Sequence, residues 1–210
     1  TQDFTGVNPA NGVVFYYHLP EGISDKDIAL EIRDAKDHVI RRFSGLKDPS
    51  YSPYEGAPDP NPVLSLKTGL NRFVWDMKHE SLPGIPKAYI ETSYSGHKVL
   101  AGNYTAILTV ANTQKTVSLK ILPNPFEIAT QEALEAWDNF MTIGEANYRE
   151  MAHLVNELYP VQSSLAQLLK NNKVASNPEL SQGVNALLLD LKDWDQEMIQ
   201  RLSKAYDDVE

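Results

Sequence analysis

The stretch GLNRFVWDMKHE (residues 69–80) decides how the first half of the chain is expected to fold. Apolar and polar side chains alternate along its first part, which is typical of a half-buried β-strand. Alternate side chains of a strand share one face, and here that face holds Asn71, Phe73, Trp75 and Met77. Because Phe73 and Trp75 carry a large apolar area, we expect this face to point into a core. Asp76 would then end the strand and accept hydrogen bonds from loop N–H groups.

The charged residues after this strand admit a second interpretation. Asp76, His79 and Glu80 could form an acid–base cluster, but no nucleophile or second carboxylate stands at an informative spacing from them. We therefore interpret Trp75 and Asp76 as residues that define the fold, and the charges that follow as part of a loop.

Further short strands are predicted on both sides of this stretch, within residues 1–125. This half holds eleven of the 13 prolines and nine of the 11 glycines, which separate short runs of alternating hydrophobicity. The runs predict strands at 13–19, 28–34, 38–43, 71–77, 103–110 and 115–122, with hairpin turns at 34–38 and 111–115. The pattern favours an antiparallel β-sandwich, with a β-meander barrel as the alternative.

One of these strands carries a further mark of a sandwich domain. Gly102 precedes Tyr104, and Ala106, Leu108 and Val110 continue the same strand face. This arrangement is typical of the tyrosine corner, in which the phenol bonds to the backbone while the ring fills the core.

The apolar period changes in residues 126–210, which predict an antiparallel helical hairpin. Apolar positions at alternating spacings of three and four lie at Leu134, Trp137, Met141, Gly144, Tyr148, Met151, Val155 and Leu158, and again at Leu180, Val184, Leu187, Leu191, Trp194 and Met198. Pro160 should kink the first helix or split it in two. Residues 171–179 are expected to form the turn.

The two tryptophans of the hairpin should have different neighbours. In a hairpin that turns near residue 175, Trp194 should meet the chain near Leu154–Leu158. Trp137 would lie beyond the reach of the second helix. We therefore expect the β-sandwich, or a segment outside this chain, to cover Trp137.

The distribution of charge limits the possible partners. Residues 126–210 carry 6 basic and 15 acidic side chains, which accounts for the whole net charge of −9. Neither half offers the basic patch that a phosphate backbone or an anionic membrane requires, and no apolar run is long enough to span a bilayer. We expect no nucleic-acid binding and no membrane insertion. The absence of cysteine excludes disulfides and thiol chemistry.

No motif predicts a catalytic residue, a cofactor or a metal site. The five histidines, His18, His38, His79, His97 and His153, have no local ligand spacing. Glu55 and Asp59 could serve glycoside hydrolysis only at a suitable separation, and a solvated loop is the favoured interpretation.

Two long loops contain the candidate ligand-binding residues. The loops span 45–62 and 81–102, and an edge strand is expected at Ala88–Thr92 in the second. Their aromatic candidates are Tyr51, Tyr54, Tyr89 and Tyr94. Exposed tyrosines on sandwich loops can stack against sugar rings. The alternative is that these rings pin the loops onto the sheet or onto a neighbouring domain.

Four segments carry a resemblance to a known family. They are NPANGVVFYYHLP (8–20), IALEIRDAKDHVIRRF (28–43), GLNRFVWD (69–76) and LAGNYTAILTV (100–110). In order and spacing they resemble the immunoglobulin-like modules of flagellar hook-capping proteins and secretion tails. This resemblance implies that the sandwich is of the immunoglobulin or fibronectin type III kind. The similarity covers most of residues 8–122, apart from insertions at 45–62 and 81–99. With the helical hairpin, the whole chain is similar to the C-terminal region of large exported bacterial proteins with sortilin-like BNR-repeat β-propellers, often labelled glycosyl hydrolases.

The resemblance implies a non-catalytic accessory module rather than an enzyme. The partner would be an upstream β-propeller domain or another protein, and the location would be periplasmic, cell-surface or secreted. No catalytic residue of any family maps onto the matching segments. Two alternatives stay open: a carbohydrate-binding module that uses the loop tyrosines, and a free-standing hydrolase.

Overall fold

The structure is a computed structural model that describes residues 6, 8–88, 90, 92–199 and 201 of the chain. Among these residues the chain forms six strands and three helices: β1 (Val13–Leu19), β2 (Ile28–Arg33), β3 (Val39–Ser44), β4 (Gly69–Trp75), β5 (Gly102–Val110), β6 (Thr113–Ile121), α1 (Gln131–Leu168), α2 (Asn172–Ala175) and α3 (Pro178–Met198). The six strands confirm the strands predicted from the alternation, and their ends differ by at most two residues.

The chain forms two compact units, each containing segments from distant parts of the sequence. The β unit contains the described residues up to Tyr51 together with Pro60–Ser81 and Ser95–Thr142. The helical unit contains Ser52–Asp59, Leu82–Tyr94 and the described residues from Ile143 onward. Parts of both long loops therefore belong to the helical unit, and the first turns of α1 belong to the β unit. The division into domains 1–125 and 126–210 stays a prediction.

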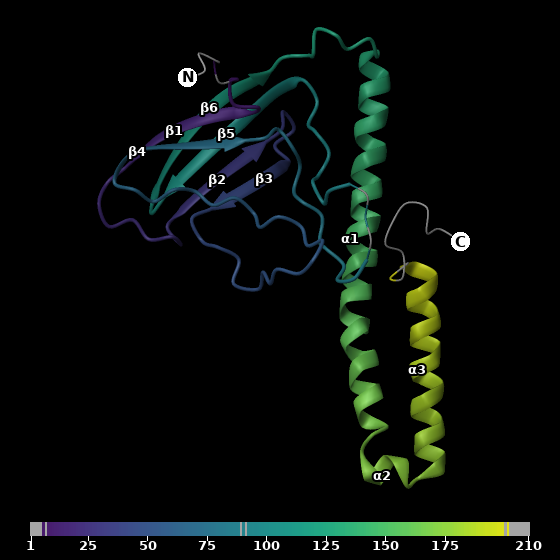
Figure 1. The fold of residues 1–210 in the computed structure, drawn as a ribbon. Helices are drawn as coiled ribbons and strands as arrows, with labels where there is room; N and C mark the ends of the chain where they lie inside the picture. The colour runs from purple at the N-terminus through teal and green to yellow at the C-terminus, as the bar shows by residue number, and fades with distance from the viewer. Residues whose placement is uncertain (1–5, 7, 89, 91, 200, 202–210) are drawn as a thin grey trace, which may run out of the picture. The chain divides into compact units, whose positions relative to one another are not determined.

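Two antiparallel sheets build the β unit. β1 pairs with β4 in a two-stranded sheet, and the other sheet has the order β3-β2-β5-β6 (Figure 1). Buried side chains from both sheets form one cluster, so the arrangement is sandwich-like. The predicted hairpins are present, because β2 pairs with β3 and β5 pairs with β6 along most of their length.

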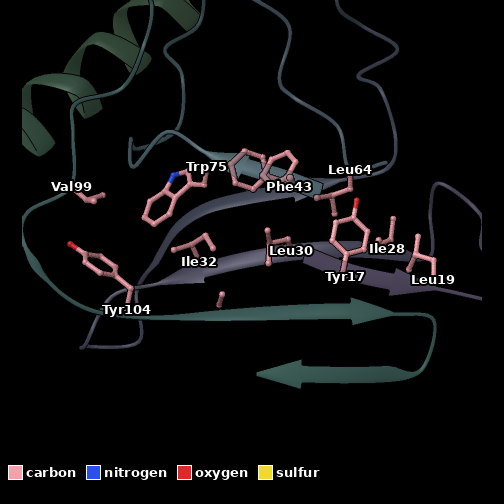
Figure 2. Packing of buried hydrophobic residues seen from close by; sticks show 12 residues of the cluster. Tyr17, Leu19, Ile28, Leu30, Ile32, Phe43, Leu64, Trp75, Val99 and Tyr104 are labelled. Atoms are coloured by element: carbon pink, nitrogen blue, oxygen red, sulfur yellow. The ribbon is translucent and has the colours of Figure 1, made fainter. Parts of the chain in front are cut away.

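The core of the β unit contains the side chains that the alternation assigned to it. Asn71, Phe73 and Trp75 are buried, whereas Arg72, between them on the other face, is exposed. Trp75 is fully buried, and its Nε1–H donates to the Lys78 carbonyl at 2.9 Å. Figure 2 shows Trp75 among the other buried side chains that fill the space between the strands.

The tyrosine corner is confirmed at the start of β5. The Tyr104 hydroxyl donates to the Leu100 carbonyl at 2.8 Å, and the ring packs edge-on against Trp75 with centroids 6.1 Å apart. Burial raises the pKa of Tyr104 to about 12. The phenol is therefore a neutral donor that ties the loop before β5 to the core.

The predicted edge strand at Ala88–Thr92 is wrong for the residues that the structure describes. Ala88, Ile90 and Thr92 have no strand structure, and positions 89 and 91 lie outside the described residues. The physical reason lies just upstream, where two prolines at 83 and 86 cannot donate ladder hydrogen bonds. The Ala88 N–H instead closes a turn onto the Ile85 carbonyl at 3.1 Å.

The helical unit is organised around the second half of α1 and α3, which lie side by side (Figure 1). The short helix α2 connects them. Asn171 and Asn177 cap the starts of α2 and α3 with their side chains, and Pro178 occupies the first turn of α3. α1 continues through Pro160 without a break, so the proline does not split the helix. A kink at this position stays a prediction.

The heptad predicted for α3 is partly wrong. Val184 is buried as expected, but Leu180 and Leu187 are 47% and 48% exposed. Leu188 and Asp195 are buried instead. The expectation assumed that α3 packs only against α1. A cluster formed by Ile85, Ala152, Val155 and Ile199 shows that a loop segment shares this core.

Trp194 packs against the cluster that contains Ala152 and Val155 of α1. A direct contact with Leu154–Leu158 stays a prediction. Near the end of α3, Asp195 forms a bidentate ion pair with Arg201, at 2.6 and 2.7 Å. Arg201 also donates to the Pro86 carbonyl and stacks over the Tyr159 ring. These contacts explain why a charged side chain occupies the buried face of α3.

Candidate functional site

The candidate site begins where the chain leaves β4 and pairs with a segment of the second long loop. Lys78 and Lys98 form an antiparallel bridge. On either side of it, the His79 N–H donates to the His97 carbonyl and the Val99 N–H donates to the Met77 carbonyl, both at 2.9 Å. This register makes His79 and His97 directly opposed neighbours, whose side chains lie close together.

A glycine permits this close approach. A Cβ added at Gly96 would lie 2.6 Å from the Glu80 carbonyl oxygen and 2.7 Å from the His79 carbonyl group. Any other residue would force the two segments apart. Gly96 is therefore a structural requirement of the histidine pair.

Three side chains of the β unit contact the His97 ring: those of His79, Trp137 and Asp138. It stacks on the His79 ring, with centroids 4.0 Å apart and an interplanar angle of 15°. The Trp137 ring meets it edge-on at 5.6 Å. The Nε2 atom lies 3.3 Å from Oδ1 of Asp138. Trp137 and Asp138 come from the first turns of α1.

The cover expected for Trp137 is only partial. Its side chain is 43% exposed, and the contact with His97 belongs to the β unit. The ring is therefore neither fully exposed nor fully buried.

A buried arginine fixes the main chain beneath the site. Arg41 on β3 is 5% exposed. Its guanidinium donates to the His79 carbonyl, to Asn61 Oδ1 at 3.2 Å and to Ser81 Oγ at 3.4 Å. Because a buried guanidinium needs several oxygen acceptors, Arg41 anchors residues 79–81 to the sheet. Nothing in the local sequence around Arg41 indicated this role.

His79, His97 and Asp138 offer ligand atoms that all lie within 4.8 Å of one another. Imidazole nitrogen and carboxylate oxygen are common ligands for zinc and related cations. No local spacing in the sequence links these three residues. Here a long-range strand pairing and a helix bring the three groups together.

The residues proposed as an acid–base cluster take other positions. The Asp76 carboxylate accepts a hydrogen bond from the Lys78 N–H at 3.2 Å, which confirms its expected role at the end of the strand. Glu80 is exposed, and the His79 ring stacks on His97, with a ligand atom of Asp138 within 4.8 Å. In the 45–62 loop, Glu55 and Asp59 are both exposed.

Among the described loop tyrosines, Tyr94 is buried rather than exposed. Tyr51 is 37% exposed and belongs to the β unit, whereas Tyr54 and Tyr94 belong to the helical unit. Tyr94 is 5% exposed, and its hydroxyl accepts a hydrogen bond from the Ile85 N–H at 3.3 Å. Tyr89 lies outside the described residues. For Tyr94, this geometry favours the role of pinning a loop.

Two of the loop tyrosines, Tyr54 and Tyr94, lie near Tyr148 of α1. Burial raises the pKa of Tyr148, and its neighbours Tyr94 and Tyr54 raise it further. The Tyr148 hydroxyl donates to the Pro83 carbonyl at 3.2 Å. The tyrosine rings therefore pack within the helical unit.

A second candidate surface is a groove in the β unit along the outer edge of β1. The groove has a volume of about 420 Å³, and its lining includes the five consecutive residues 14–18 together with Lys115 and Val117. β1 pairs with β4 along one edge. Among the described residues, no strand pairs with the other edge of β1. Because one sheet has two strands and the other has four, Val117 on the inner face of β6 is 60% exposed.

In comparisons with known proteins, no protein-family model, no curated protein and no solved structure matches the chain. None of the described helices is long and apolar enough to cross a membrane.

Proposed function

We propose that the chain is a non-catalytic accessory module that binds a neighbouring domain or protein through the groove beside β1. In this proposal the β unit is an immunoglobulin-like sandwich, and the module works in an exported protein beside a β-propeller. The resemblance of segments 8–20, 28–43, 69–76 and 100–110 supports this context.

The groove is the observation that carries the proposal. The inner face of β6 bears Lys115, Val117, Leu119 and Ile121, which lie opposite Leu108, Ala106, Tyr104 and Gly102 of β5. Val117 points toward the inside of the sandwich, yet the two-stranded sheet does not cover it. A strand edge beside uncovered apolar side chains is the surface that strand addition uses.

The proposed occupant is an extended segment of the partner with alternating apolar side chains. Its backbone would pair with the outer edge of β1, and its apolar side chains would cover Val117. The added strand needs apolar side chains on one face only, because its opposite face would remain in solvent. The loop tyrosines support the carbohydrate alternative less well, because Tyr94 is buried.

Site-specific photo-crosslinking tests the proposal in the complete gene product within its own cells. A photoreactive phenylalanine analogue replaces Val117 or, as the matched control, Thr116, which is exposed on the other face of β6. We expect position 117, but not 116, to crosslink to an extended apolar segment outside residues 1–210.

Crosslinks from position 117 that map only inside these 210 residues would contradict the proposal, as would equal crosslinking from both positions. Hydrolysis of a polysaccharide by the purified chain would contradict the non-catalytic assignment and favour the hydrolase alternative.

A further inference from the structure

We propose that His79, His97 and Asp138 bind one zinc ion, with solvent completing its coordination. The inference is independent of the groove and of the partner proposed above. It rests on the geometry of the three side chains, all of which belong to the β unit.

The separation of the three ligand groups is close to what zinc requires. Two ligand atoms on a tetrahedral zinc, each about 2.0–2.1 Å from the metal, lie roughly 3.4 Å apart. His97 Nε2 and Asp138 Oδ1 are 3.3 Å apart. The whole set fits within 4.8 Å. The His79 and His97 rings are stacked almost parallel, so His79 would have to change its side-chain rotamer and leave this stack to direct a nitrogen at the same ion.

The His97 ring and the main chain of His79 are held in place before any metal arrives. His97 is buried, and its ring is fixed by stacking on His79 and by the edge contact with Trp137. The main chain of His79 is held by the guanidinium of Arg41 and by pairing with the His97 carbonyl. Neighbouring groups that fix the orientation of a ligand ring are typical of metal sites.

The charges near the histidines are the Asp138 carboxylate, two lysines and the buried Arg41 guanidinium, which donates to the His79 carbonyl. Asp138 supplies a carboxylate on one side of the His97 ring. Lys78 and Lys98 form the bridge next to the histidine pair, and alternation along paired segments places them on the opposite face. Two nitrogen ligands and one oxygen ligand leave a position open for water, as in zinc sites with three protein ligands.

A bound zinc would join three segments that are distant in sequence. It would connect the end of β4, the loop before β5 and the first turns of α1. Because an unfolded chain does not present these ligands together, zinc should bind the folded β unit preferentially and stabilise it.

Titration calorimetry with zinc chloride tests the inference on the full, tag-free chain after treatment with a chelator. We expect one zinc per chain and a rise in melting temperature on zinc addition. His97→Phe keeps an aromatic ring between His79 and Trp137 but removes the ligand nitrogen. His97→Phe and Asp138→Asn should each weaken zinc binding by roughly tenfold or more.

His153→Gln is the matched control, because it removes a different histidine–carboxylate pair, His153 with Glu157 at 3.5 Å on the surface of α1. It should leave zinc binding unchanged. Circular dichroism without zinc establishes that each variant is folded. If a variant unfolds, His79→Gln replaces it, and loss of the visible spectrum of tetrahedral Co²⁺ is the second readout.

The inference is overturned if the folded parent chain binds no zinc, or if His97→Phe and Asp138→Asn bind zinc as tightly as the parent. An equal loss of affinity in His153→Gln would also overturn it, because binding would then reflect the surface histidines.

Discussion

Replacing Trp75 with alanine should destabilise the β unit more than any exposed substitution on the same strand. Trp75 is fully buried, and its ring contacts that of Tyr104. Truncation of a buried Phe or Trp to alanine typically lowers the free energy of unfolding by about 3–5 kcal/mol. The Lys78 carbonyl also loses the indole N–H, which adds about 1 kcal/mol if no water replaces it.

Urea unfolding and thermal melting, each followed by circular dichroism, measure this effect. At roughly 2–4 °C per kcal/mol for a chain of this size, a total loss of about 3–6 kcal/mol should lower the melting temperature by about 6–24 °C. Trp75→Phe keeps most of the apolar volume and loses the hydrogen bond, so its cost should be clearly smaller. Leu70→Ala is the matched control, because Leu70 lies on β4 but is 72% exposed.

Leu70→Ala should change the stability by no more than about 0.5 kcal/mol. If Trp75→Ala costs less than about 1 kcal/mol, or no more than Leu70→Ala, the strand does not present Trp75 to a core. The assignment of the whole stretch 69–80 would then fail.

Two further predictions concern buried polar groups. Because burial raises the pKa of Tyr104 to about 12, above the value near 10 of an unfolded tyrosine, its stabilising contribution is complete below pH 10 and is lost as the pH rises from 10 to 12. Tyr104→Phe should therefore reduce the fall in unfolding free energy over this pH window, and an unchanged slope would refute the assignment. Arg201→Leu leaves the carboxylate of Asp195 buried without its guanidinium and should cost about 3–5 kcal/mol in urea unfolding. The double variant Arg201→Leu/Asp195→Leu should recover most of this loss, whereas a double variant as unstable as Arg201→Leu would show that the ion pair is not the cause.

Local patterns in the sequence were sufficient to predict the strands and the burial of their aromatic residues. Alternation along β4 placed Phe73 and Trp75 on the buried face, because the two faces of a strand follow directly from its geometry. The tyrosine corner at Tyr104 was predictable for a similar reason, since its hydrogen bond reaches a carbonyl only four residues away.

The helical pattern was less informative, because a heptad shows which residues share a face but not what covers that face. Leu187 fits the heptad and is exposed, whereas Asp195 does not fit and is buried. Asp195 is stabilised there by Arg201, which lies beyond the end of α3. Such a partner becomes visible only when the chain is folded.

The histidine–aspartate cluster depended entirely on tertiary structure. His79 and His97 become neighbours through pairing of two loop segments that Gly96 allows to approach. Asp138 reaches them from a helix, and no spacing in the sequence links it to either histidine. The sequence by itself determined which faces of the strands are apolar, because that property is local. Only the tertiary structure decided which polar side chains meet, because their contacts depend on how distant segments pack.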